Sequence, residues 1–164
     1  MDIRTSLRNF CDKKTCPVKK ELFSRMIFNA MGHNTDDHAR NFGFLYDGRR
    51  VFLSPAYDIG PVIATPGVGT QYQQAIIVDK GSRVTTQENL VSDHSRFVLS
   101  KNESMSRIRQ LFSVVMDWER TFLSCGVQAA EIRKREGSFE VAKHVFDPQK
   151  TQGQAQTYEP DIER

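Results

Sequence analysis

Three polar residues follow one another in an order that could support phosphoryl transfer. Asp36 is followed five positions later by Asn41, and Asp58 comes further along the chain. This Asp–Asn spacing occurs in loops where the aspartate accepts the proton of an attacking hydroxyl and the asparagine oxygen ligates Mg²⁺. A second aspartate would complete a set of hard oxygen ligands, which suits Mg²⁺. The residues therefore predict Asp36 as the general base and Asn41 and Asp58 as metal ligands.

A buried helix and a loop are expected to position the first two of these residues. Residues 18–31 carry apolar side chains around most of a helical circumference, which predicts a helix buried on most sides. Pro17 is well placed at its start, and Gly32 is expected to end it as a C-terminal glycine. The polar stretch HNTDDHARN at 33–41 predicts a loop, because its side chains compete with helical hydrogen bonds.

A short β-hairpin is expected to deliver Asp58. The dipeptide Asp47-Gly48 is a turn signal between apolar runs at 42–46 and 51–53. The second strand would then lead back toward the loop. Asp58 would follow the end of that strand, which is a favourable place for a functional carboxylate.

The rest of the chain is expected to be mostly helical. Apolar spacing predicts helices over about 2–10, 86–99, 102–123 and 127–135. Thr85 or Thr86 can cap the second of these, and Gly126 should terminate the third. Residues 60–74 are rich in Gly, Pro and Thr and predict a long loop, and residues 75–78 could form a short strand or a buried turn.

The predicted architecture is mainly α with a small inserted β-hairpin, an α+β fold. Residues after Asp147 offer almost nothing to bury. Residues 1–146 are therefore expected to form one domain and residues 147–164 a disordered tail.

Composition limits the class of protein. The 164 residues are 38% hydrophobic and 26% charged, which is typical of a globular chain. No apolar run approaches the roughly 20 residues of a membrane helix, and the charged N-terminus has no signal-peptide pattern, so a cytoplasmic protein without membrane contact is expected. The net charge of +3 is too small to indicate direct nucleic-acid binding. The three cysteines are expected to be free thiols.

The central part of the chain resembles the HipA-like kinases. The stretches NTDDHARNFGFLYDG and VFLSPAYDIGP are similar to the family pattern N-x-D-x-H-x-K-N, a hairpin, and L-x-P-x-Y-D. The resemblance covers roughly residues 18–125 and is specific over 34–61. It implies the C-terminal lobe of a protein-kinase-like fold of the HipA type. It also implies phosphorylation of a protein serine or threonine, with ATP and Mg²⁺ as cofactors.

The resemblance assigns roles to five residues. Asp36 falls on the family's catalytic aspartate, and Asn41 and Asp58 fall on its two metal-binding positions. His38 is the motif histidine, which we interpret as orienting the loop. Arg40 stands where lysine is usual, and its cation could meet a phosphate of the nucleotide with a different geometry.

The loop admits two other interpretations. Aspartates in turns often act as caps, which is the structural alternative for Asp36 and Asp37, and Asp37 is assigned no role. His33 and His38 flank Asp36, but their spacing is not that of a zinc-binding helix and no further ligand is placed. The order of the loop, hairpin and second aspartate favours phosphoryl transfer over both.

The nucleotide-gripping half of a kinase is not evident in this sequence. Gly32 is the only glycine before the loop, and Gly67 and Gly69 come after Asp58, which is the wrong order for a phosphate clamp. We therefore expect that activity needs an N-terminal lobe from a separate chain. The alternative is an inactive, truncated relative that serves as a protein-binding module or is a gene relic. Such a chain should expose apolar surface, with Val62, Ile63 and the helix at 18–31 as candidates.

The resemblance also implies partners. Members of the family are often toxins that are held by a DNA-binding antitoxin. Their known protein substrates lie in translation and include an aminoacyl-tRNA synthetase.

Overall fold

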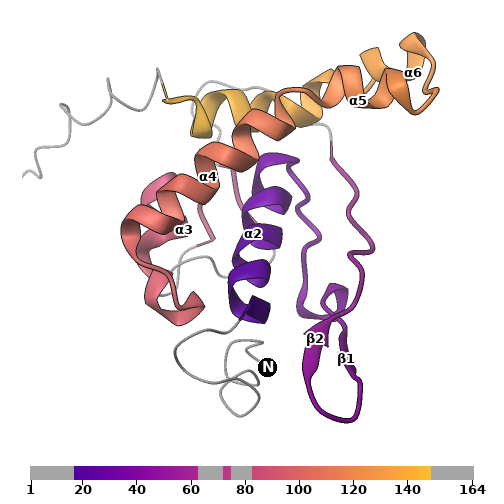
Figure 1. The fold of residues 1–164 in the computed structure, drawn as a ribbon. Helices are drawn as coiled ribbons and strands as arrows, with labels where there is room; N and C mark the ends of the chain where they lie inside the picture. The colour runs from indigo at the N-terminus through magenta and orange to yellow at the C-terminus, as the bar shows by residue number, and fades with distance from the viewer. Residues whose placement is uncertain (1–16, 63–71, 75–82, 149–164) are drawn as a thin grey trace, which may run out of the picture.

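The computed structural model describes residues 17–62, 72–74 and 83–148. These residues form a mainly helical body from which one antiparallel hairpin projects (Figure 1), which confirms the predicted α+β class. The helices and strands are α2 (Pro17–Met31), β1 (Phe44–Tyr46), β2 (Val51–Leu53), α3 (Gln87–Ser92), α4 (Lys101–Val115), α5 (Trp118–Ser124) and α6 (Ala129–Arg133). Single turns of tighter or wider helix are η2 (Ala39–Asn41), η3 (His94–Phe97), η4 (Glu136–Phe139) and η5 (Ala142–Phe146).

Helix α2 is the central element of the body, as the sequence predicts. It begins at Pro17, whose fixed φ and missing N–H suit the first helical position. Phe23 and Ile27 are fully buried, and the helix contacts α4, η3, β2 and η5. The expectation that residues 18–31 present an exposed apolar face is therefore wrong, because these neighbours cover the apolar side chains.

The end of α2 differs from the prediction in one residue. His33, and not Gly32, adopts the left-handed conformation, with φ of 51°. The N–H of Asn34 then bonds to the Asn29 carbonyl at 2.8 Å, and the N–H of His33 bonds to the Ala30 carbonyl at 3.3 Å. This pair of bonds is the Schellman arrangement. The glycine is thus the last residue of right-handed backbone, and the chain turns into the loop one residue later.

A tight turn closes the hairpin where Asp47-Gly48 predicts it. The Asp47 carboxylate accepts hydrogen bonds from the N–H groups of Arg49 and Arg50, at 2.9 and 2.8 Å. Gly48 has φ of 91°, a conformation that favours glycine. The strands pair Phe44 with Leu53, Leu45 with Phe52, and Tyr46 with Val51.

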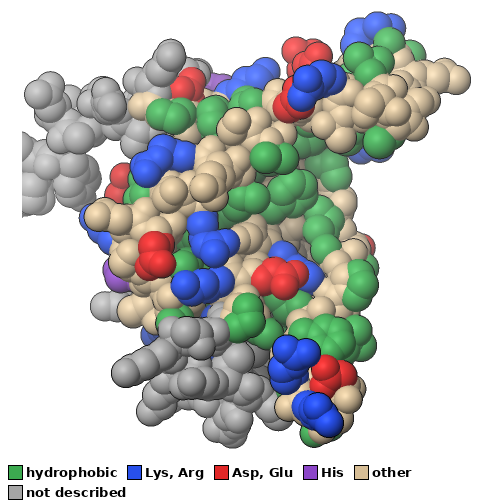
Figure 2. Space-filling view, viewed as in Figure 1, with side chains coloured by type: hydrophobic (Ala, Val, Ile, Leu, Met, Phe, Trp, Pro, Cys, Tyr) green, Lys and Arg blue, Asp and Glu red, His purple; other side chains and the backbone are tan. Residues whose placement is uncertain are grey.

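Apolar side chains of the hairpin and of the chain after it are exposed, unlike those of α2. Leu45, Tyr46, Phe52 and Val62 are exposed by 45, 69, 41 and 43%. Figure 2 shows apolar side chains gathered from the hairpin upward along one side of the molecule. Of the predicted apolar surface, Val62 is exposed as expected, and Ile63 lies outside the described residues.

The predicted helix over 86–99 is shorter than expected. Thr86 caps α3 as predicted, because its hydroxyl accepts a bond from the N–H of Asn89 at 3.1 Å. The helix ends at Ser92 and continues only as η3. Val98 then takes a left-handed φ of 58°, which no helix can contain.

The predicted helix over 102–123 is two helices. Helix α4 ends at Val115 and α5 begins at Trp118, whose ring stacks on Phe139 with 4.4 Å between ring centroids. This tertiary contact overrides the continuous helical periodicity. Gly126, with φ of 81°, follows α5 as predicted. The last predicted helix is reduced to α6.

Some predictions fall on residues that the structure does not describe. These are the helix at 2–10, the strand or turn at 75–78, Gly67 and Gly69, and the tail beyond Pro148. In the described part of the chain, no helix has the length and apolar character that crossing a membrane requires.

Candidate functional site

Two stretches of chain carry the predicted site residues. The polar loop (residues 32–41) follows α2, and the return segment (residues 54–62) runs back from β2 beside it (Figure 1). Gly43 allows their close approach, because a Cβ there would lie 2.9 Å from Oγ of Ser54. The hairpin thus connects the two stretches and returns the second one to the first.

Three side chains bond the loop to the return segment, and one of them is His33, whose Nδ1 lies 3.2 Å from the Val62 carbonyl oxygen. Asn34 Nδ2 donates a hydrogen bond to the Asp58 carbonyl at 3.3 Å. Tyr57 Oη donates one to the Arg40 carbonyl at 2.7 Å. The structure therefore brings the loop that carries Asp36 beside the segment that carries the second aspartate, as the sequence predicts.

Asp36 presents its carboxylate to solvent. Its side chain is 81% exposed, and its Oδ1 lies 3.9 Å from Nε2 of His38. The backbone N–H of His38 bonds to the Asp36 carbonyl at 2.8 Å. The other ring nitrogen, Nδ1, is buried without a hydrogen-bond partner among the described residues. His38 is thus packed against the loop with Nε2 near the aspartate, which fits the orienting role that the resemblance implies.

Asn41 is held in one orientation. Its side chain is buried, and Nδ2 donates a hydrogen bond to the Asp36 carbonyl at 3.0 Å. A carbonyl can only accept, so the amide nitrogen must face it. This leaves Oδ1 of Asn41, an oxygen suited to Mg²⁺, free of that contact.

Asp58 lies in the return segment with an unusual backbone. Its φ of 56° is in the left-handed region, which aspartate tolerates better than most residues. The residue is exposed, so its carboxylate is accessible. Arg40 is also exposed, and it contacts the return segment through its backbone carbonyl. No contact joins the carboxylates of Asp36 and Asp58 directly in the described part of the chain.

A buried polar network underlies the loop, and sequence reasoning missed it. Asp37, to which no role was assigned, is fully buried. With its NH₂ toward the two acceptors, the Gln74 side chain donates to Asp37 Oδ2 at 3.1 Å and to the Asn34 carbonyl at 2.8 Å. Gln74 is far away in sequence, so only the adjacent Asp36-Asp37 pair could have signalled a buried carboxylate here.

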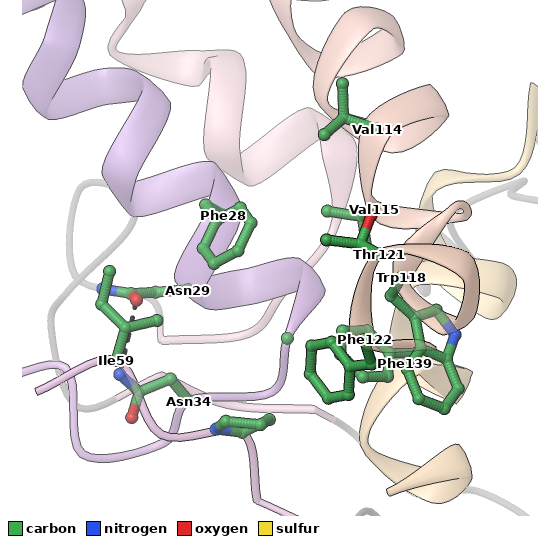
Figure 3. Close-up of a pocket in the computed structure, with 12 residues that line it drawn as sticks. Phe28, Asn29, Asn34, Ile59, Val114, Val115, Trp118, Thr121, Phe122 and Phe139 are labelled. Carbon is green, nitrogen blue, oxygen red and sulfur yellow. Dashed lines mark hydrogen bonds between the residues drawn. The ribbon is translucent and has the colours of Figure 1, made fainter. Parts of the chain in front are cut away.

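An apolar cavity of about 390 Å³ lies next to this network. Figure 3 shows Asn29, Asn34 and Ile59 on one side of it, and Trp118 and Phe122 on the other. The wall formed by the two asparagines belongs to the end of α2 and to the polar loop. The cavity therefore lies behind the loop and supplies no charged group to the site.

The chemistry of the site rests on oxygen ligands. Among residues 17–62, 72–74 and 83–148, no three His, Cys, Asp or Glu side chains are grouped as a metal site. The predicted Mg²⁺ ligands are one amide oxygen and one carboxylate, a small protein contribution that is usual when phosphates and water supply the rest. Both groups are oxygen donors of the kind that Mg²⁺ prefers.

Comparison with known proteins gives the same assignment as the motif. The model of the HipA-like C-terminal domain matches residues 1–134. The chain belongs to this family. The protein named "Putative kinase Y4mE" from Sinorhizobium fredii is 27% identical over 97 residues. That alignment covers 59% of this chain but only 22% of the relative, so this HipA-like domain spans a small part of that relative's length.

Proposed function

We propose that this HipA-like domain is the catalytic-loop half of a protein serine/threonine kinase, with the C-lobe architecture of that enzyme class. The observation that carries the proposal is the Asn41 amide, which is fixed on the Asp36 carbonyl with its oxygen left for a metal ion. The bond between Asn34 and the Asp58 carbonyl supports it, because this bond keeps Asp58 beside the loop.

Each residue has a distinct task in this proposal. The exposed Asp36 carboxylate accepts the proton of the substrate hydroxyl as that oxygen attacks the γ-phosphorus of ATP, and the bond from the γ-phosphorus to the bridging oxygen breaks to release ADP. Asn41 Oδ1 and the Asp58 carboxylate would hold Mg²⁺, which when bound would neutralise charge on the phosphates. The exposed cation of Arg40 can approach the same phosphates. His38 keeps Asp36 oriented from 3.9 Å away.

We further propose that the remaining phosphate contacts come from a separate N-terminal lobe. Phosphate positioning and charge neutralisation provide most of the rate in this chemistry, and the assigned residues supply about half of the required parts. The family resemblance alone suggests two partners. One is a protein substrate from translation, such as an aminoacyl-tRNA synthetase, and the other is a DNA-binding antitoxin.

Calorimetric titration of ATP into the 164-residue chain, with and without Mg²⁺, tests the proposal. We expect ATP binding that requires Mg²⁺ and is weakened at least about tenfold in Asp58→Asn. Asparagine tolerates the left-handed backbone of Asp58, so this variant removes charge without adding strain. Asp117→Asn is the control, because Asp117 is a surface carboxylate paired with Arg120 on α5.

Binding that is unaffected by Asp58→Asn would contradict the assignment of the metal ligand. A second candidate function, an inactive protein-binding module, is favoured by the exposed Leu45, Tyr46 and Phe52 of the hairpin. It predicts no ATP affinity in the wild-type chain. It also predicts that partner binding is lost in Tyr46→Ser and is retained in Asp58→Asn.

A further inference from the structure

We propose that Asn34 is a positioning residue that holds Asp36 and Asp58 in register, and that Gln74 and Asp37 fix Asn34 in turn. The inference rests on the proposed function, because it concerns the geometry of the same two carboxylates. The proposed role of Asn34, Asp37 and Gln74 is to position other residues, and none of the three contacts substrate or metal.

Asn34 contacts both halves of the site with one planar group. Its Oδ1 accepts a hydrogen bond from the N–H of Asp36 at 3.3 Å, and its Nδ2 donates to the Asp58 carbonyl at 3.3 Å. Nδ2 also lies 3.3 Å from Oδ1 of Asn29 on α2. The side chain is only 4% exposed. A rigid amide that is bonded at both ends therefore sets the spacing between the backbones of the two aspartates.

The backbone conformation of Asp58 depends on its hydrogen bond with Asn34. Its φ of 56° is a conformation that non-glycine residues adopt at some energetic cost. The Asp58 carbonyl accepts the hydrogen bond from Asn34, so this bond favours that conformation. Without the bond, the peptide can relax toward right-handed or extended backbone, and the Asp58 carboxylate would then point elsewhere.

Gln74 supports Asn34 from a distant part of the sequence. It follows Gln73, which pairs with Val84, and its own N–H bonds to the Arg83 carbonyl at 2.9 Å. Its buried NH₂ bonds to the Asn34 carbonyl and to the Asp37 carboxylate. A buried carboxylate is costly unless donors satisfy it. The Asp37 carboxylate and the Asn34 carbonyl both accept hydrogen bonds from the NH₂ of Gln74. These two bonds fix the buried side of the loop.

The test measures metal binding directly and needs no kinase activity. Mn²⁺ alone is titrated into the full chain and followed by water-proton relaxation, because Mn²⁺ accepts the same oxygen ligands as Mg²⁺. Asn34→Ala is compared with wild type at a temperature well below the melting point of each variant. Gln87→Ala is the matched control, since Gln87 is also a buried amide and its Nε2 donates a similar bond to the Val145 carbonyl at 2.8 Å, in another part of the fold.

We expect Asn34→Ala to weaken Mn²⁺ binding by roughly three- to tenfold, the effect of losing one or two hydrogen bonds that orient a ligand. Gln87→Ala should leave the affinity within about twofold, even where it lowers the melting temperature as much. If Asn34→Ala does not fold, Gln74→Ala replaces it. That variant removes the support of the loop without touching Asp36 or Asp58, and it should change the affinity in the same direction.

The possible failures are distinguishable. In one outcome, Asp58→Asn abolishes Mn²⁺ binding, but Asn34→Ala and Gln74→Ala bind Mn²⁺ as tightly as wild type. That outcome overturns the positioning role and leaves the proposed function standing. Wild-type chain that binds neither Mn²⁺ nor Mg²⁺·ATP overturns both.

Discussion

At the scale of single residues, exposure and chemistry separate the groups that could react from those that hold them. Asp36 projects into solvent, whereas Asn34, Asp37 and Asn41 are buried around its backbone. Asp36→Asn should therefore change the free energy of unfolding by no more than about 0.5 kcal/mol, as surface substitutions usually do. The same change should reduce phosphoryl transfer by about 100-fold or more, because the proton acceptor is lost.

Radiolabelled phosphate transfer, with the rest of the kinase supplied, measures the rate, and chemical denaturation measures stability. Asp47→Asn is a useful contrast, because the N–H groups of Arg50 and Arg49 hold the pKa of Asp47 below its usual value. That variant should lower stability and leave transfer intact. Full activity in Asp36→Asn would show that another group takes the proton.

The sequence could predict that the loop with Asp36 and Asn41 lies beside the segment with Asp58, because a hairpin joins them; the roles of the three residues stay predictions. It could not predict the partner of Asp37. Gln74 meets Asp37 only through the folding of two segments that are far apart in sequence, and no local pattern records that contact. An aspartate without an evident role was in fact a fully buried support of the loop.

At the scale of elements, helix interiors were predictable and several helix ends were not. The apolar pattern of α2 was sufficient, because its burial agrees with its periodicity. The break between α4 and α5 was missed, because the stacking of Trp118 on Phe139 is a tertiary contact. The left-handed residues His33 and Val98 were missed because neither is a glycine, the residue type that most often signals such a turn.

The start of α4 gives a pH-dependent prediction. Glu103 accepts bonds from both the N–H and the hydroxyl of Ser100, at 2.7 and 2.8 Å, in a capping box. The Ser100 N–H, the Ser100 hydroxyl and nearby Lys20 hold the pKa of Glu103 below its ordinary value of 4.5. Since folding lowers this pKa, the stabilisation is present above pH 4.5 and is lost as the pH falls through the folded-state value.

Glu103→Gln should thus be less stable than wild type at neutral pH, and the difference in melting temperature should shrink in acid. Ser100→Ala, which removes the cap itself, should cost about 1 kcal/mol at neutral pH. Thermal melts from neutral to acidic pH measure both. A difference between Glu103→Gln and wild type that stays constant with pH would contradict the lowered pKa.

At the scale of the whole molecule, the core extends past the boundary of the family match. The match ends at residue 134, yet Phe139, Val141 and Phe146 are buried beyond it. Gln87 Nε2 donates a hydrogen bond to the Val145 carbonyl at 2.8 Å, and η5 contacts both α2 and α4. The C-terminal turns therefore help to enclose the helix that leads into the polar loop.

Phe146→Ala tests this dependence. The ring is 1% exposed, so its removal should destabilise the chain by about 3–5 kcal/mol, through lost burial and the cavity that remains. Leu123→Ala is the control, because Leu123 is 56% exposed and should change stability by about 0.5 kcal/mol or less. Chemical denaturation of both variants measures the difference. If a chain that ends at Lys134 melts like the full chain, the segment beyond the family match is dispensable, and α2 and the loop that it positions are held by the matched region alone.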